Sequence, residues 1–156
     1  MARPAPSAGL GILNLLLIAL IVAAGTGIVA ARVGPGAQRQ AIGEHMPVAA
    51  VDWLLANEVG GRAFNTYSWG GYLGLRRPDL PVYIDGRSDI YGDAPIREYA
   101  GAVLLETDPA ELLDQRQIDH VLFSVGTPLA AWLDDSPQWE RAYADNLAAV
   151  WIRSDQ

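Results

Sequence analysis

The residues best suited to chemistry in this sequence come directly after a predicted strand at residues 81–85. Asp85, Arg87 and Asp89 lie close together there, with Gly86 opening the turn. An arginine can clamp an anion through two parallel hydrogen bonds, and carboxylates can accept hydrogen bonds from sugar hydroxyls or bind a divalent cation. The pattern indicates a site for a polar ligand, in which Asp85 and Asp89 are the only metal candidates. The alternative is an internal Asp–Arg pair that holds the turn.

A second cluster, from Asn65 to Tyr72, follows another predicted strand. Trp69 and Tyr72 could stack on a sugar face, and Gly70-Gly71 could present backbone N–H groups to an anion. The alternatives are that the aromatic residues fill the core and that the glycines allow close packing of the backbone. The ligand-binding candidates from the two clusters are Asn65, Trp69, Gly70, Gly71, Tyr72, Asp85, Arg87, Asp89 and Tyr91.

The residue types exclude several kinds of catalysis and predict no cofactor. Cysteine is absent, and all 11 basic residues are arginine, so thiol, zinc-thiolate and lysine chemistry are not available. His45 and His120 are the only histidines, too few for a histidine-rich metal site. We expect His120, beside Asp119 at the start of a strand, to be a hydrogen-bonded structural residue. No established catalytic motif occurs, so the catalytic residues are unknown.

Hydrophobic periodicity and turn residues predict the elements that must position these side chains. Alternation of strands and helices indicates an α/β fold, a small mixed and partly parallel sheet of about five strands with flanking helices. The predicted strands are 62–67, 81–85, 119–125 and a hairpin of 139–143 with 147–153 about Asp145-Asn146. The predicted helices are 47–58, 72–75, 94–104, 109–116 and 128–133. Ligands of such sheets bind beyond the carboxyl ends of the strands, where both clusters fall.

The N-terminal region predicts a single transmembrane helix. Residues 10–31 are almost wholly apolar, and 22 helical residues cover roughly 30 Å, the thickness of a bilayer core. The alternative is a cleaved signal peptide, whose apolar core is usually about 7–15 residues long. We therefore divide the chain into an N-terminal flank (1–9), a transmembrane helix (10–31), a linker (32–46) and an α/β domain (47–156). Arginines on both sides of the helix leave its orientation open.

The charge balance argues against nucleic-acid binding. The residues after 31 hold 10 arginines against 18 acidic residues, whereas proteins that bind nucleic acid non-specifically present a basic surface. The expected partners are the lipid bilayer, a glycan or lipid-linked sugar, and a membrane protein.

Two segments, Phe64–Leu73 and Pro81–Gly92, together resemble a known group of bacterial proteins. They are similar to the C-terminal domain of uncharacterised polytopic membrane proteins that look like lipid-linked-sugar glycosyltransferases of the protein mannosyltransferase-like type. The similarity covers roughly residues 47–153 and implies an extracytoplasmic domain. In that superfamily the catalytic acid lies among many N-terminal membrane helices, and only one is predicted here. Catalysis is therefore not carried over.

The function that we predict is a membrane-anchored accessory domain, not catalytic on its own, that binds or positions a glycan, lipid-linked sugar or membrane partner. Such a chain could also be the tail of a larger transferase-like membrane protein. Two alternatives stay open. One is a metal-assisted enzyme that acts on a phosphosugar through Asp85 and Asp89, and the other is a purely structural module.

Overall fold

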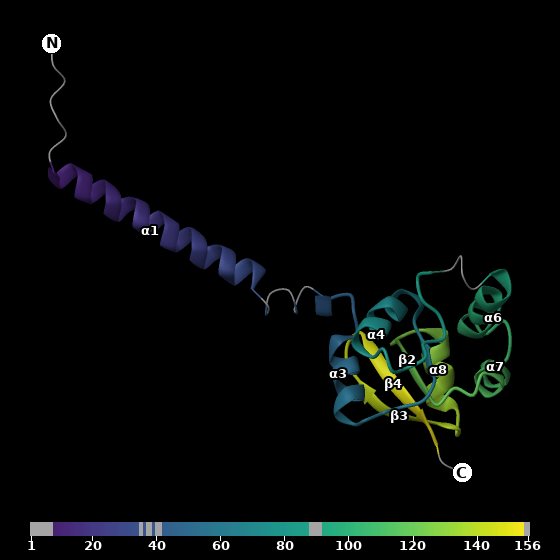
Figure 1. Ribbon diagram of the computed structural model, residues 1–156. Helices are drawn as coiled ribbons and strands as arrows, with labels where there is room; N and C mark the ends of the chain where they lie inside the picture. The colour runs from purple at the N-terminus through teal and green to yellow at the C-terminus, as the bar shows by residue number, and fades with distance from the viewer. Residues whose placement is uncertain (1–7, 35, 37–38, 40–41, 88–91, 155–156) are drawn as a thin grey trace. The chain divides into compact units, whose positions relative to one another are not determined.

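The chain folds into an N-terminal helix and a separate α/β domain (Figure 1). The computed structural model describes residues 8–34, 36, 39, 42–87 and 92–154. Contacts divide the chain into residues 1–42 and 43–156, each with its own internal contacts. We therefore describe the helix and the domain separately.

The N-terminal helix α1 (Ala8–Val33) has no buried segment. Its stretch Gly9–Arg32 has a mean hydropathy of 2.5 and is 24 residues long. The hydroxyl of Thr26 donates to the carbonyl of Val22 within the helix (2.6 Å), so this polar group needs no outside partner. One exposed apolar helix is therefore present, and by length and composition it is either a membrane anchor or a signal sequence.

Four strands form a mixed sheet in the order β1-β2-β4-β3. They are β1 (Ala63–Asn65), β2 (His120–Ser124), β3 (Trp139–Ala144) and β4 (Ala148–Arg153). β1 pairs parallel to β2, whereas β4 is antiparallel to both of its neighbours. The predicted α/β fold with a mixed, partly parallel sheet is confirmed.

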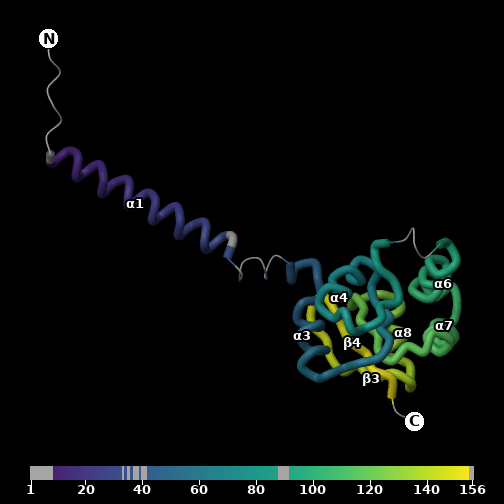
Figure 2. The backbone as a smooth tube through the Cα atoms, viewed as in Figure 1, coloured from purple at the N-terminus to yellow at the C-terminus, as the bar shows by residue number. Residues whose placement is uncertain are grey.

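Helices cover both faces of the sheet, because alternate residues of the central strands point to opposite sides. Val121 and Phe123 of β2 pack against α6 (Asp93–Val103), α7 (Pro109–Gln115) and α8 (Pro128–Asp135). The path of the backbone shows these layers (Figure 2).

On the other face, Leu122 of β2 packs against α3 (Val48–Ala56), the 3-10 turn η1 (Tyr67–Trp69) and α4 (Gly70–Arg76). The domain thus has two apolar clusters, one on each side of a thin sheet.

The prediction of a strand at 81–85 is wrong. Only one parallel bridge, from Ala63 to Val82, joins this segment to β1, through hydrogen bonds between Ala63 N and Pro81 O and between Tyr83 N and Ala63 O (both 3.0 Å). Beyond that bridge, the side chain of Asn65 replaces the backbone. Its Oδ1 accepts from Tyr83 N (3.1 Å), and its Nδ2 donates to Ile84 O (2.8 Å). A side-chain amide offers the same donor and acceptor as a peptide group, so the segment is held without a regular ladder.

We expect Asn65→Ala to lower the free energy of unfolding by about 3 kcal/mol, because the buried backbone groups of Ile84 lose their partner and Tyr83 N keeps only its bond to Ala63 O. Denaturant unfolding of the full chain in mild detergent measures this. Asn57→Ala is the matched control, since it removes one exposed hydrogen bond, to Trp53 O. Equal losses in the two variants would contradict the assigned role of Asn65.

Candidate functional site

The carboxyl ends of β1, of the bridged segment and of β2 lie at one edge of the sheet, because these segments are parallel. There the hydroxyls of Thr66 and Ser124 lie 3.3 Å apart, and Ser124 N donates to Thr66 Oγ1 (3.1 Å). Asn65 is fully buried and makes the contacts to Tyr83 and Ile84 given above. These rim groups bind one another, which fixes the position of the loops around them.

Asp85 and Arg87 form the internal pair that the sequence analysis gave as the alternative. Arg87 donates from Nη2 (2.6 Å) and Nε (2.9 Å) to Asp85 Oδ2, and its backbone N donates to Asp85 Oδ1 (2.9 Å). Asp85 is only 5% exposed, whereas the Arg87 side chain is 69% exposed. The carboxylate thus pins the turn, and the arginine is the part that a ligand can reach. Asp89 and Tyr91 lie outside the described residues.

Trp69 is a core residue rather than an exposed stacking platform. It is 3% exposed and belongs to the apolar cluster of α3 and α4. Its Nε1 donates to the carbonyl of His45 (3.1 Å), which fixes the point where the chain enters the domain. Tyr72, one turn away, is half-buried, and its hydroxyl accepts from Arg76 Nη1 (2.8 Å).

The two glycines differ in their surroundings. A Cβ at Gly70 would lie 2.1 Å from the carbonyl oxygen of Ile84 and 2.7 Å from the Cα of Asp85. A Cβ at Gly71 would meet nothing within 4 Å. Gly70 is therefore required by the close approach of the segment that carries Asp85, whereas Gly71 is not constrained in this way.

His120 is a buried residue of the central strand β2, and its interaction with the backbone of Gly60 falls short of normal hydrogen-bond geometry. It is completely buried, and neither ring nitrogen makes a hydrogen bond of normal geometry to the described residues. Burial lowers the pKa of His120 to about 4; the backbone of Gly60 and the carboxylate of Asp119 act against this, and the charge of Arg77 adds to it. His120 is thus a neutral core residue near pH 7, not a base at the rim.

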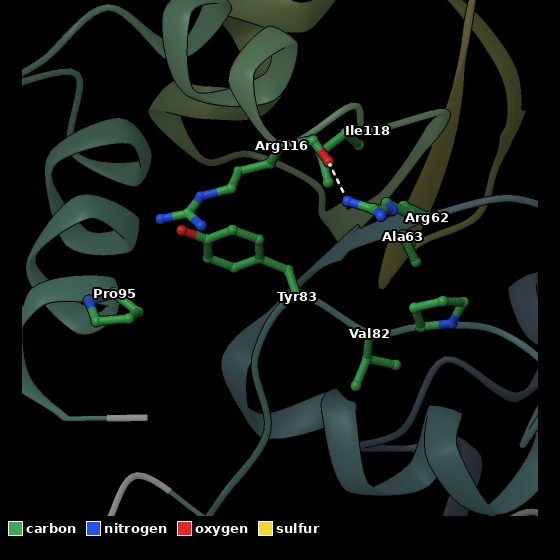
Figure 3. A pocket seen from close by; sticks show the side chains of 8 residues that line it. Arg62, Ala63, Val82, Tyr83, Pro95, Arg116 and Ile118 are labelled. Atoms are coloured by element: carbon green, nitrogen blue, oxygen red, sulfur yellow. Dashed lines mark hydrogen bonds between the residues drawn. The ribbon is translucent and has the colours of Figure 1, made fainter. Parts of the chain in front are cut away.

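Sequence analysis missed a pocket of about 310 Å³ at the opposite, amino ends of β1 and the bridged segment (Figure 3). The residues that line it are Arg62, Ala63, Pro81, Val82, Tyr83, Pro95, Arg116 and Ile118. They come from four separate parts of the chain and share no spacing pattern. The only local signal was an arginine at the start of the predicted strand 62–67.

No described group of three or more His, Asp or Glu side chains is arranged to hold a metal ion. Within the described part of the site, Asp85 pairs with Arg87 instead. The metal-assisted alternative therefore gains no support from these residues.

No protein-family model matches this sequence, and comparisons with curated proteins and with solved structures gave no match. The resemblance to membrane glycosyltransferases thus stays a prediction.

We expect Gly70→Ala to destabilise the domain by about 3 kcal/mol, because the new methyl group overlaps backbone atoms of Ile84 and Asp85 that cannot swing away. Gly71→Ala lies in the same helix with open space around it and should be neutral or stabilise by up to about 1 kcal/mol. Thermal unfolding of both variants tests this. Similar melting temperatures for the two would contradict the close approach at Gly70.

We expect acid to destabilise the domain through His120. The pKa of the His120 imidazole is about 6.5 in the unfolded state and about 4 in the folded state. Between these two values the unfolded state binds a proton and the folded state does not, so stability falls as the pH falls. Stability should fall by about 3 kcal/mol between pH 7 and pH 4 from this residue alone. The measurement is denaturant unfolding across that range. His120→Leu should show a correspondingly smaller fall than the wild type, and the exposed control His45→Gln should not. An unchanged fall in His120→Leu would refute the assignment.

Proposed function

We propose that this chain is a membrane-anchored accessory domain, not catalytic on its own, that binds or positions a glycan, a lipid-linked sugar or a membrane partner. The observation that carries the proposal is α1, an apolar helix whose stretch Gly9–Arg32 is long and hydrophobic enough to cross a membrane and is not buried. A helix of 26 residues is about 39 Å long, enough to cross a bilayer core. The apolar stretch is also longer than the usual core of a signal sequence. Both lengths favour an anchor over a cleaved leader.

The way the chain enters the domain supports a role close to the membrane. The carbonyl of His45 is bound by Trp69, and Met46 packs against the apolar cluster beneath α3 and α4. Eleven residues, 34–44, remain between this point and α1. Fully extended, they span at most about 40 Å. An anchored chain would therefore keep the domain near the bilayer surface. The resemblance implies the extracytoplasmic side.

The described rim favours recognition over catalysis. The Asp85 carboxylate is bound by Arg87, and the hydroxyls of Thr66 and Ser124 by each other. Arg87 is the described candidate that combines charge with high exposure. An arginine held in place by a buried carboxylate is preorganised, since part of its conformational freedom is already lost before a ligand binds. It would serve to recognise a sugar hydroxyl or an anionic group.

We expect the full chain, expressed in a bacterial host, to stay in the membrane fraction after alkaline extraction with residues 1–33 still attached. Mass spectrometry of the extracted protein checks the second point. A variant in which Leu15, Leu16 and Leu17 are replaced by Arg is the control, because three charges in the centre of the helix oppose insertion. Recovery of the intact wild-type chain in the aqueous fraction, or removal of its leader, would contradict anchoring.

The ligand half of the proposal is tested with the full chain in lipid nanodiscs on a glycan panel that includes polyprenyl-linked sugars. Binding to at least one sugar should weaken about tenfold in Arg87→Ala, the loss expected for one charged hydrogen-bond donor. Arg97→Ala is the matched control, because Arg97 is also an exposed arginine with a carboxylate partner, Asp93. If the anchored chain binds no sugar on the panel, a glycan ligand is rejected, and a protein partner is the remaining form of the proposal.

A further inference from the structure

We propose that the pocket at the amino ends of β1 and the bridged segment binds a small soluble molecule that carries a carboxylate or phosphate on an apolar or aromatic body. We call it the Tyr83 pocket, and its lining residues are the eight given above. It lies beyond the start of β1, whereas the Asp85–Arg87 turn follows the end of the segment paired with β1. The inference does not depend on the proposed glycan contact at Arg87.

The walls of the Tyr83 pocket suit an apolar body. Ala63, Pro81, Val82, Pro95 and Ile118 contribute carbon surface, and the ring of Tyr83 lies among them (Figure 3). A space of about 310 Å³ is at the lower end of the range for pockets that bind small molecules. Such walls favour a ring or a short branched chain over a long flexible one.

The charge of the pocket selects an anion. Of the eight described residues that line it, two are arginines and none is acidic. Arg116 forms an ion pair with Glu98, and both side chains are about half exposed. Arg62 has no carboxylate partner among the described residues, and its Nη1 donates to the carbonyl of Arg116 (3.3 Å).

Arg62 is an exception within this acidic domain. The α/β domain contains eight arginines, and the other seven each pair with an aspartate or glutamate within 4 Å. The Asp119 carboxylate is close in the fold, but it accepts from the backbone N of Arg62 (2.7 Å) and does not line the pocket. The Arg62 guanidinium thus keeps donors for an anion, because none of the described lining residues is acidic and Glu98 pairs with Arg116.

The Tyr83 hydroxyl is the second, independent feature that points to a ligand. Its oxygen is buried and makes no hydrogen bond of normal geometry to the described residues, although the guanidinium of Arg116 lies beside it (Figure 3). Its interaction with Arg116 falls short of that geometry, and a buried hydroxyl that lacks a good hydrogen bond is costly. A ligand oxyanion beside Tyr83 and Arg116 would accept from both, and Arg62, which lies near the other end of the Tyr83 side chain, adds positive charge to the same pocket. A carboxylate or phosphate carries the negative charge that arginine binds most strongly, and a neutral alcohol lacks it.

The test compares four probes on the full chain in nanodiscs by isothermal titration calorimetry, with empty nanodiscs as the blank. Phenyl phosphate and benzoate carry both features, benzyl alcohol lacks the charge, and inorganic phosphate lacks the ring. We expect the first two to bind at least about tenfold more tightly than the other two, with dissociation constants in the millimolar range usual for ligands of this size. Equal affinity for benzyl alcohol and phenyl phosphate, or no binding up to about 10 mM, would overturn the proposal.

Two variants place the binding in the pocket. Arg62→Gln removes a charge that has no carboxylate partner among the described residues and should weaken the binding of phenyl phosphate about tenfold. Tyr83→Phe removes only a hydroxyl that makes no described hydrogen bond, so it should fold normally and weaken binding several-fold. Arg141→Gln is the control, because Arg141 is exposed, pairs with Asp134 and lies outside the pocket. Wild-type affinity in Tyr83→Phe and Arg62→Gln would overturn the site. If Arg62→Gln does not fold, the affinity of Tyr83→Phe and the comparison of the four probes on the wild type decide whether the proposed site is correct.

Discussion

The structure depends on how the segment 81–87 is held against the rest of the sheet. A regular strand would use its backbone throughout, but here one bridge to β1 is followed by the side-chain amide of Asn65, and Gly70 allows the backbone of Ile84 and Asp85 to approach α4 closely. Asn65 is buried and Gly70 has no side chain, so neither contact can adjust much. The same segment carries Tyr83 at one end and the Asp85–Arg87 pair at the other. Both candidate sites therefore depend on the contacts made by Asn65 and Gly70.

Short-range signals explain why most of the fold could be predicted. Asp108 accepts from Ala110 N at the start of α7, and Thr127 accepts from Ala130 N at the start of α8. Asp145 accepts from Leu147 N and Ala148 N in the hairpin turn. In each case the residue that fixes the element lies within three positions of the group that it binds. The boundaries of these helices and of the hairpin were accordingly predicted to within about two residues.

Long-range contacts explain why the rest could not. Asn65 binds groups 19 residues away, so nothing in the run Pro81–Asp85 shows that its pairing partner is a side chain. The buried state of His120 depends on the neighbouring strands β1 and β4, where it pairs with Ala63 and Ile152, and a lone histidine beside an aspartate gives no sign of them. The Tyr83 pocket combines four separate segments. A single sequence offers no spacing rule for such a combination, whereas the Asp85–Arg87 pair is local, and its internal form was foreseen as one of two outcomes.

The distribution of charge separates the two ends of β1. At the carboxyl end, Asp85 neutralises Arg87, so this arginine is held in place but its net field is weak. At the amino end, Arg62 is held by a carbonyl, which fixes the side chain without cancelling its charge. A domain with a large acidic excess repels anions at long range, and only a local site with uncancelled positive charge can retain one. The amino end meets this condition, whereas the Asp85–Arg87 turn is better suited to neutral, hydroxyl-rich ligands, for which hydrogen-bond geometry matters more than charge.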